Sequence, residues 1–195
     1  MPLSERRRGR SSSIVAVTTC LVVGSLLAAG CSSSAGSAKA TDVTICNATG
    51  TEQGPADLPA VATVLTAIDA LEAKLGGPQQ YFEVNATAKV VNLFVALNGA
   101  TLAQAWLYAQ GTLTSQPGQK ASGGTFTRAD LDFQPDTVLT TVRRQIPEAT
   151  LESFYVNGDG KGHVQYGVLT SARCGGGLDV VVGPTGAVKS VNPVQ

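Results

Sequence analysis

This 195-residue chain contains a single histidine, His163, and it lacks the paired motifs that mark a nucleophile and its base. A general base needs a nucleophile or an orienting acid beside it, and neither G-x-S-x-G nor a comparable pattern is present. His163 is therefore interpreted as a solvent-facing residue, and Asp130 and Asp132 as part of a polar edge. These absences argue against an enzyme, and no catalytic residue is assigned.

Histidine clusters and C-x-x-C pairs are also missing, which argues against a zinc site. Residues 157–162 (NGDGKG) are weakly similar to a calcium loop, but Lys161 replaces an oxygen ligand and Val168 stands where a glutamate is needed. Residues 175–177 (GGG) lack the Gly-Lys-Ser/Thr that follows in a phosphate-binding loop. We therefore expect no metal and no cofactor.

Charged residues make up only 14% of the chain, and no basic stripe is present. Four of the 14 basic residues and one of the 14 acidic residues lie in the first ten positions, so the remainder carries a net charge of about −3. This balance gives no electrostatic reason to expect nucleic acid as a ligand. Hydrophobic residues, at 43%, are frequent enough to build a folded core.

The N-terminal apolar run at residues 14–27 is short and is interrupted by Thr18, Thr19 and Ser25, whereas a bilayer-spanning helix needs about 20 apolar residues. Arginines precede the run and small residues end it, which is the layout of an export signal. The sequence LAAGC follows at residues 27–31. It resembles the lipobox of bacterial prolipoproteins, in which the cysteine receives a diacylglycerol, the peptide is cut before it, and the new amino group is acylated.

The lipobox resemblance implies that residues 1–30 are a signal peptide and that Cys31 is lipidated. Ala28 stands where leucine is usual, and the alternatives are an uncleaved membrane anchor or an ordinary thiol at Cys31. On the lipoprotein interpretation the acyl chains hold the protein in the membrane, on the extracytoplasmic face of the cell membrane. Residues 31–41, rich in serine and alanine, are then a flexible tether.

The four cysteines divide into two groups. Cys20 lies in the signal peptide and Cys31 takes the lipid, which leaves Cys46 and Cys174. Because an exported chain folds in an oxidising compartment, this pair predicts a disulfide. In the chain-entropy model, a loop from position 46 to position 174 stabilises the fold by about 4–5 kcal/mol. A redox-active or metal-binding pair is the alternative, which the lack of a C-x-x-C motif disfavours.

Two stretches of the chain match each other almost in register. Residues 82–97 (FEVNATAKVVNLFVAL) and 154–169 (FYVNGDGKGHVQYGVL) share five identities at a separation of 72 positions. Amphipathic helical patterns precede both stretches, one beginning after Asp57 and one at residues 136–146, and strand patterns with glycine-containing turns such as Asn98-Gly99 follow them. These matches indicate an internal duplication. They predict an α+β fold of two helix-plus-antiparallel-meander repeats, with the helices packed on one face of the sheet.

The repeats are predicted at residues 42–114 and 125–195, with the low-complexity segment 115–124 (SQPGQKASGG) as a linker. Residues 178–191 (LDVVVGPTGAVKSV) resemble the last hairpin of the PepSY module. The duplicated arrangement is similar to the β-lactamase-inhibitor-protein architecture, in which two helix-plus-sheet repeats present a concave surface to an enzyme. The resemblance rests on pattern and implies no site residue.

The two stretches differ in the polarity of one strand. Aligned at 72 positions, Val91, Leu93 and Val95 take the places of polar residues or glycine, so the first sheet is predicted to be apolar on both faces. Either another part of the chain covers the extra face, or it is a surface for a protein partner or a lipid chain. In the second case Trp106 and Tyr108 are expected at its rim.

The sequence thus suggests a lipid-anchored, non-catalytic binding or inhibitory module of the cell envelope. Its expected partners are the membrane, through the acyl chains on Cys31, and an envelope protein or lipid. Nucleic acid is not expected. The alternative function is a lipid or glycolipid carrier with an apolar cavity between sheet and helix, which lipid found with the purified protein by mass spectrometry would favour.

Overall fold

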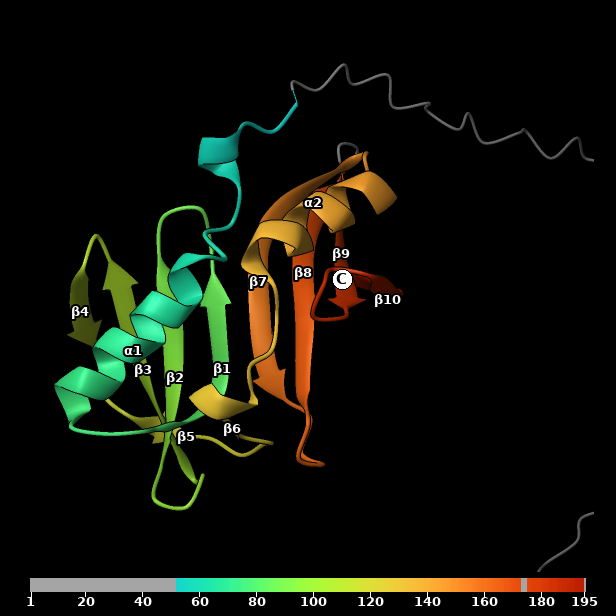
Figure 1. The fold of residues 1–195 in the computed structure, drawn as a ribbon. Coiled ribbons are helices and arrows are strands. Elements are labelled where there is room, and N and C mark those ends of the chain that lie inside the picture. Colours follow the sequence, from blue (N-terminus) through green and yellow to red (C-terminus); the bar gives the residue numbers. More distant parts are fainter. Residues whose placement is uncertain (1–51, 173–174, 195) are drawn as a thin grey trace, which may run out of the picture. The chain divides into compact units, whose positions relative to one another are not determined.

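The computed structural model describes residues 52–172 and 175–194 (Figure 1). In chain order its elements are η1 (Pro55–Asp57), α1 (Thr63–Leu75), β1 (Gln80–Ala86), β2 (Val91–Leu97), β3 (Leu102–Ala109), β4 (Thr112–Ser115), β5 (Gln119–Lys120), β6 (Phe126–Thr127), η2 (Arg128–Asp130), α2 (Pro135–Gln145), β7 (Ala149–Gly158), β8 (Val164–Ala172), β9 (Gly177–Val182) and β10 (Val188–Val194). All of these elements belong to one compact unit. Within the described ranges, no helix has both the length and the hydropathy to cross a bilayer.

The strands form one antiparallel sheet in the order β10-β9-β8-β7-β1-β2-β3-β4, with β5 beside β3 and β6 beside β1. Strands β1 and β7 meet at its centre, where Val84 faces Val156 and Ala86 faces Phe154. Figure 1 shows β7 beside β1 in this central position. Side chains of neighbouring strands therefore form continuous rows across the whole sheet.

The predicted fold class, two helix-plus-antiparallel-meander repeats with helices packed on one face, is wrong. The protein is mostly one ten-stranded antiparallel sheet, and the described residues contain only two short α-helices, of 13 and 11 residues. Because β1 and β7 pair with each other, their N–H and C=O groups bond across the division that the repeat interpretation assumes. If β1 and β7 were edge strands, their backbone N–H and C=O groups would lack hydrogen-bond partners in the sheet. This favours the pairing of β1 with β7.

The segment 115–124, expected to be a linker, takes part in this sheet. Ser115 ends β4, and β5 pairs with β3 through Lys120 opposite Leu102. Gly124 forms a β-bridge with Gly158 at the end of β7. Strands pair through backbone N–H and C=O groups, which nearly every residue has. A low-complexity composition therefore does not prevent a segment from pairing in a sheet.

Local signals account well for where the two helices begin and end. α1 starts at Thr63 rather than just after Asp57, because Pro59 disfavours helical geometry in the residue before it. It ends at Leu75, and the next residue, Gly76, has a left-handed φ of 85° and donates its N–H to the Glu72 carbonyl. The helix predicted at residues 136–146 is confirmed as α2, which begins with Pro135 in its first turn.

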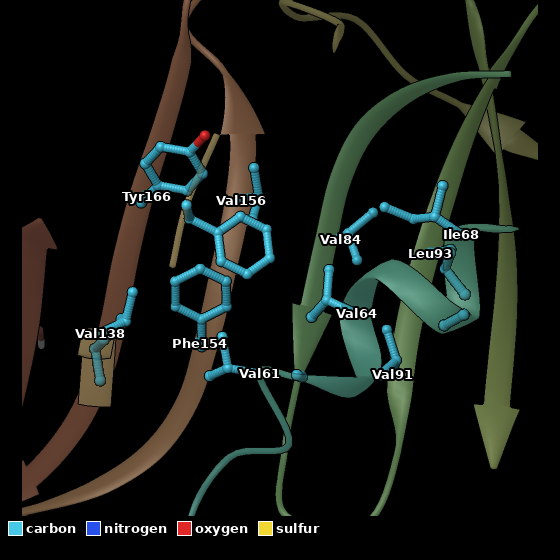
Figure 2. Close-up of a cluster of buried hydrophobic side chains, with 14 of the residues drawn as sticks. Val61, Val64, Ile68, Val84, Val91, Leu93, Val138, Phe154, Val156 and Tyr166 are labelled. Carbon is cyan, nitrogen blue, oxygen red and sulfur yellow. The ribbon is translucent and has the colours of Figure 1, made fainter. Parts of the chain in front are cut away.

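One hydrophobic core joins both helices to the sheet. Val64 and Ile68 of α1 are fully buried together with Val84 of β1 and Leu93 of β2, and Figure 2 shows these side chains directed toward one another. The buried residues of α2 belong to the same cluster as Phe154 of β7. Packing of this kind supplies most of the stability of a short helix, since isolated helices of this length are marginal in water.

The alignment that placed Val91, Leu93 and Val95 at polar positions is one residue out of register. Val84 pairs with Leu93 in the β1–β2 hairpin, whereas Val156 pairs with Tyr166 in the β7–β8 hairpin. Leu93 therefore corresponds to Tyr166, 73 positions later, rather than to the residue at 72. A slip of one residue moves every side chain of a strand to the other face, so Leu93 points into the core.

Candidate functional site

The residues predicted as a partner or lipid surface belong to the core. Val91, Leu93 and Val95 have no exposed surface, and Figure 2 shows Val91 and Leu93 beside α1. Trp106 is 8% exposed, and Lys74 Nζ lies 5.8 Å from the centroid of its ring. Tyr108 is half-buried against the same core. Of the two interpretations that the sequence left open, internal coverage therefore holds, and the covering element is α1.

Cys31, Cys46 and Cys174 lie outside the described residues. Lipidation at Cys31 and the Cys46–Cys174 disulfide therefore stay predictions.

The side of the sheet opposite the core is called here the open face. It consists of the side chains that alternate with the core residues along each strand. In the order of the sheet, these are Ala103, Ala105 and Leu107 of β3; Asn92, Phe94 and Ala96 of β2; Glu83 and Asn85 of β1; Ser153, Tyr155 and Asn157 of β7; Gln165, Gly167 and Leu169 of β8; and Asp179 and Val181 of β9. In Figure 1 the two α-helices stand in front of the sheet, so the open face is turned away from the viewer.

A band of hydrogen-bonded polar side chains crosses the open face. Asn92 Nδ2 donates to Asn85 Oδ1 over 2.8 Å, and Asn85 Nδ2 donates to Glu83 Oε1 over 2.7 Å. Across the central strand pair, Glu83 faces Asn157 and Asn85 faces Tyr155. These hydrogen bonds join β2 to β1, and the pairing of β1 with β7 places Tyr155 and Asn157, from a distant part of the chain, beside them.

Tyr155 extends this band across β8 to β9. Its hydroxyl donates to Asp179 Oδ1 over 2.7 Å. The ring lies on Gly167, its partner in β8, because a Cβ added at Gly167 would be only 2.1 Å from the ring carbon Cζ. Glycine is thus needed here so that the phenol can pass over the strand. Although Tyr155 belongs to the open face, it is only 8% exposed.

A hollow of about 340 Å³ lies over the centre of the band. It is lined by Glu83, Asn85, Ser153, Tyr155, Asn157, Leu169, Asp179 and Val194. Its walls combine two carboxylates and a phenol with two aliphatic residues, Leu169 and Val194, which are 38% and 48% exposed. A ligand in this hollow would meet both charged and apolar groups.

Of the strands that line the hollow, β1, β7, β8 and β9 contain no lysine or arginine, whereas β10, which contributes Val194, carries Lys189. In β1, β2, β3, β7, β8 and β9 the charged residues are Glu83, Glu152 and Asp179, and these six strands contain no lysine or arginine. Over the described ranges, neither Glu83 nor Asp179 has a cationic partner.

The environment of Tyr155 predicts an alkaline transition. Burial, followed by the hydrogen bond to Asp179, raises the pKa of Tyr155 to about 12 from its usual 10. The folded protein thus favours the protonated phenol, so this stabilisation is complete below pH 10 and is lost as pH rises toward about 12. The tyrosinate absorbance titrations of wild type and Tyr155→Phe should differ by one group that titrates late, because the other tyrosines are present in both proteins.

Asp179→Asn should move the pKa of Tyr155 down toward its usual value, because the phenolate would no longer face a carboxylate. Tyr166 is the internal control, since burial and its hydrogen bond with Asp132 also raise its pKa to about 12, and Asp179 does not contact it. An unchanged titration of Tyr155 in Asp179→Asn would contradict the described contact.

A second hollow, of about 380 Å³, brings together Asp130, Asp132 and His163. Asp130 Oδ2 accepts from the backbone N–H and the hydroxyl of Thr127, and Asp132 Oδ1 accepts from the Tyr166 hydroxyl over 2.6 Å. These bonds give both carboxylates a structural role at the start and the end of η2. In the part of the chain that the structure describes, no group of three or more metal-ligating side chains is placed to hold a metal ion.

The residues of the open-face hollow are not marked by any sequence motif. One local signal exists, because Glu83 and Asn85 alternate with the apolar Val84 and Ala86 and so indicate a polar strand face. Their grouping with Tyr155 depends on the pairing of β1 with β7, which no local pattern indicates. Comparisons with protein-family models, curated proteins and solved structures found no match to this chain.

Proposed function

We propose that this protein is a lipid-anchored lipoprotein of the cell envelope, that it acts as a non-catalytic binding or inhibitory module, and that its open face contacts a partner protein. The export signal and the LAAGC pattern at residues 27–31 support anchoring on the extracytoplasmic side of the membrane. The tether would leave the described domain free to meet envelope proteins.

The observation that carries the binding function is the composition of the open face. The polar band lies beside half-buried apolar residues of β2 and β3, which are Phe94, Ala105 and Leu107. An aromatic and apolar centre combined with hydrogen-bonding groups is typical of protein interfaces. This hollowed, mixed surface lies away from the core, so a partner could bind it without disturbing the fold.

The alternative function, a lipid or glycolipid carrier, has less support. It places an acyl chain between helix and sheet. Figure 2 shows the side chains of Val64, Ile68 and Leu93 in the space between α1 and the sheet, and all three are fully buried. A lipid chain there would have to displace closely packed side chains, which is costly in a dense core.

Two matched variants test the binding function. Leu169 on the open face and Leu75 at the end of α1 are 38% and 39% exposed, so neither Leu→Lys change should unfold the domain. Crosslinking in intact cells that produce the full-length lipoprotein, followed by mass spectrometry, should capture a partner with wild type. Leu169→Lys should reduce that capture by about tenfold or more, as for an interface centre, while Leu75→Lys should leave it unchanged.

Equal capture by wild type and Leu169→Lys would show that the open face is not the contact surface. Equal loss in both variants would mean that the charge change acts non-specifically and would also contradict the proposal. Circular dichroism of both purified variants verifies that they are folded.

A further inference from the structure

We infer that Asn98 is a site of spontaneous chemical modification, where the side-chain amide is lost through a succinimide and isoaspartate and aspartate are formed. This inference does not depend on the proposed function. It is carried by the contrast between two dipeptides of the same composition, Asn98-Gly99 and Asn157-Gly158, which the fold places in different surroundings.

The reaction takes place within the chain and consumes only water. The glycine backbone nitrogen loses its proton to solvent and attacks Cγ of the preceding asparagine. A C–N bond forms in a five-membered ring, and the side-chain nitrogen leaves as ammonia. Water then opens one of the two ring carbonyls, which gives aspartate or isoaspartate, in which the backbone runs through the former side chain. Glycine favours the attack because it has no Cβ beside the attacking nitrogen.

Asn98 and Gly99 lie exposed in the turn between β2 and β3, beyond the last pair of that hairpin, Leu97 with Leu102. Thr101 closes the turn by donating to the carbonyl oxygens of Leu97 and Asn98. Among the described residues, the Asn98 side chain has no hydrogen-bond partner and the Gly99 N–H donates to no acceptor. The two reacting groups are therefore in water and unrestrained, and local opening of such a turn costs little.

Asn157 and Gly158 end β7 and are held inside the sheet. Asn157 pairs with Glu83 of β1 on one side and with Gln165 of β8 on the other, and Gly158 forms a bridge with Gly124. The attack requires the backbone to rotate until the glycine nitrogen meets Cγ, whereas a paired strand stays extended. The strand must open before it can react, and residues paired on both sides open rarely.

The modification changes the charge of a neutral hairpin. Residues 91–109, which form β2, the turn and β3, contain no charged side chain, so the new carboxylate is the first charge in this segment. Isoaspartate also adds one atom to the backbone of the turn. The same two strands carry Phe94 and Leu107 of the open face. The hairpin at this edge of the open face therefore acquires negative charge slowly and irreversibly.

The test follows both dipeptides in the same molecules. The purified full chain in detergent is incubated at mildly alkaline pH, and peptide mass spectrometry measures the amide that remains at Asn98 and Asn157 over time. The amide should be lost at least about tenfold faster at Asn98, and isoaspartate should be among the products. Equal rates in the folded protein, or faster loss at Asn157, would overturn the inference. Aspartate without isoaspartate would also overturn it, because direct hydrolysis forms no succinimide.

Two controls show whether the fold and the proposed ring determine the rates. In denaturant the two dipeptides lose their different surroundings, so their rates should agree within about twofold. A tenfold difference that persists in denaturant would contradict the inference, since neighbouring residues would then set the rate. Asn98→Gln should abolish the reaction at that position, because the six-membered ring forms much more slowly, and should leave Asn157 unchanged. Circular dichroism verifies that this variant is folded.

Discussion

Replacing Leu93 with aspartate is expected to unfold the domain. Leu93 has no exposed surface and lies against α1 in the core, so the change buries an unpaired carboxylate and removes apolar contacts. Leu→Ala changes at such sites cost about 2–5 kcal/mol, and a buried charge costs more, against a total stability of about 5–15 kcal/mol. Loss of the folded circular dichroism spectrum and of a cooperative denaturant transition would be the measured result.

The matched control is Leu107→Asp on the adjacent strand. Leu107 faces Asn92 on the open face and is only partly buried, so its replacement should cost about 1 kcal/mol and leave the fold intact. The comparison tests the register of β2 and β3 directly. A folded Leu93→Asp protein together with an unfolded Leu107→Asp protein would show that the two faces of the sheet are exchanged.

Replacing Gly186 with alanine is expected to destabilise the domain by about 3 kcal/mol or more. Gly186 lies in the turn between β9 and β10, with a φ of 86°, and it is buried. A Cβ there would lie 2.3 Å from the Val138 carbonyl oxygen and 2.8 Å from Val138 Cα, so the backbone of α2 would have to move. The free energy of unfolding in denaturant gives the measured value.

Gly162→Ala is the control that measures the cost of backbone strain without a steric clash. Gly162 has a similar φ of 89°, but a Cβ at that position would meet nothing within 4 Å. Its replacement should therefore cost about 1 kcal/mol, which is the strain of the left-handed conformation alone. Equal losses in the two variants would mean that the β9–β10 turn does not pack closely on α2.

Features set by neighbouring residues were predictable from the sequence. The helix at residues 136–146 and the Asn98-Gly99 turn are both present, and in the turn both residues have positive φ, 51° and 64°. Caps, prolines and turn residues act over a few positions, so their effect can be read locally. The strand character of β2 was also visible, although its alignment with β8 was assigned one residue out of register.

That wrong assignment came from the length of a turn. Matching Phe94 with Tyr166 assumes equal hairpin loops, whereas the observed pairs, Val84 with Leu93 and Val156 with Tyr166, require one extra residue in the second hairpin. The period of a strand is two residues, so this single residue exchanged core and surface. The same local reasoning could not show that β1 pairs with β7 and that the strands form one sheet.

By itself, the sequence determined the composition of each strand, including the lack of lysine and arginine in β1, β7, β8 and β9, and the places where helices and turns begin and end. Only the tertiary structure decided which strands lie side by side, and hence that Glu83, Tyr155 and Asp179 share one hollow. The physical reason is that almost any residue can form the backbone hydrogen bonds of a sheet. Packing between segments far apart in the chain therefore determines which strands pair.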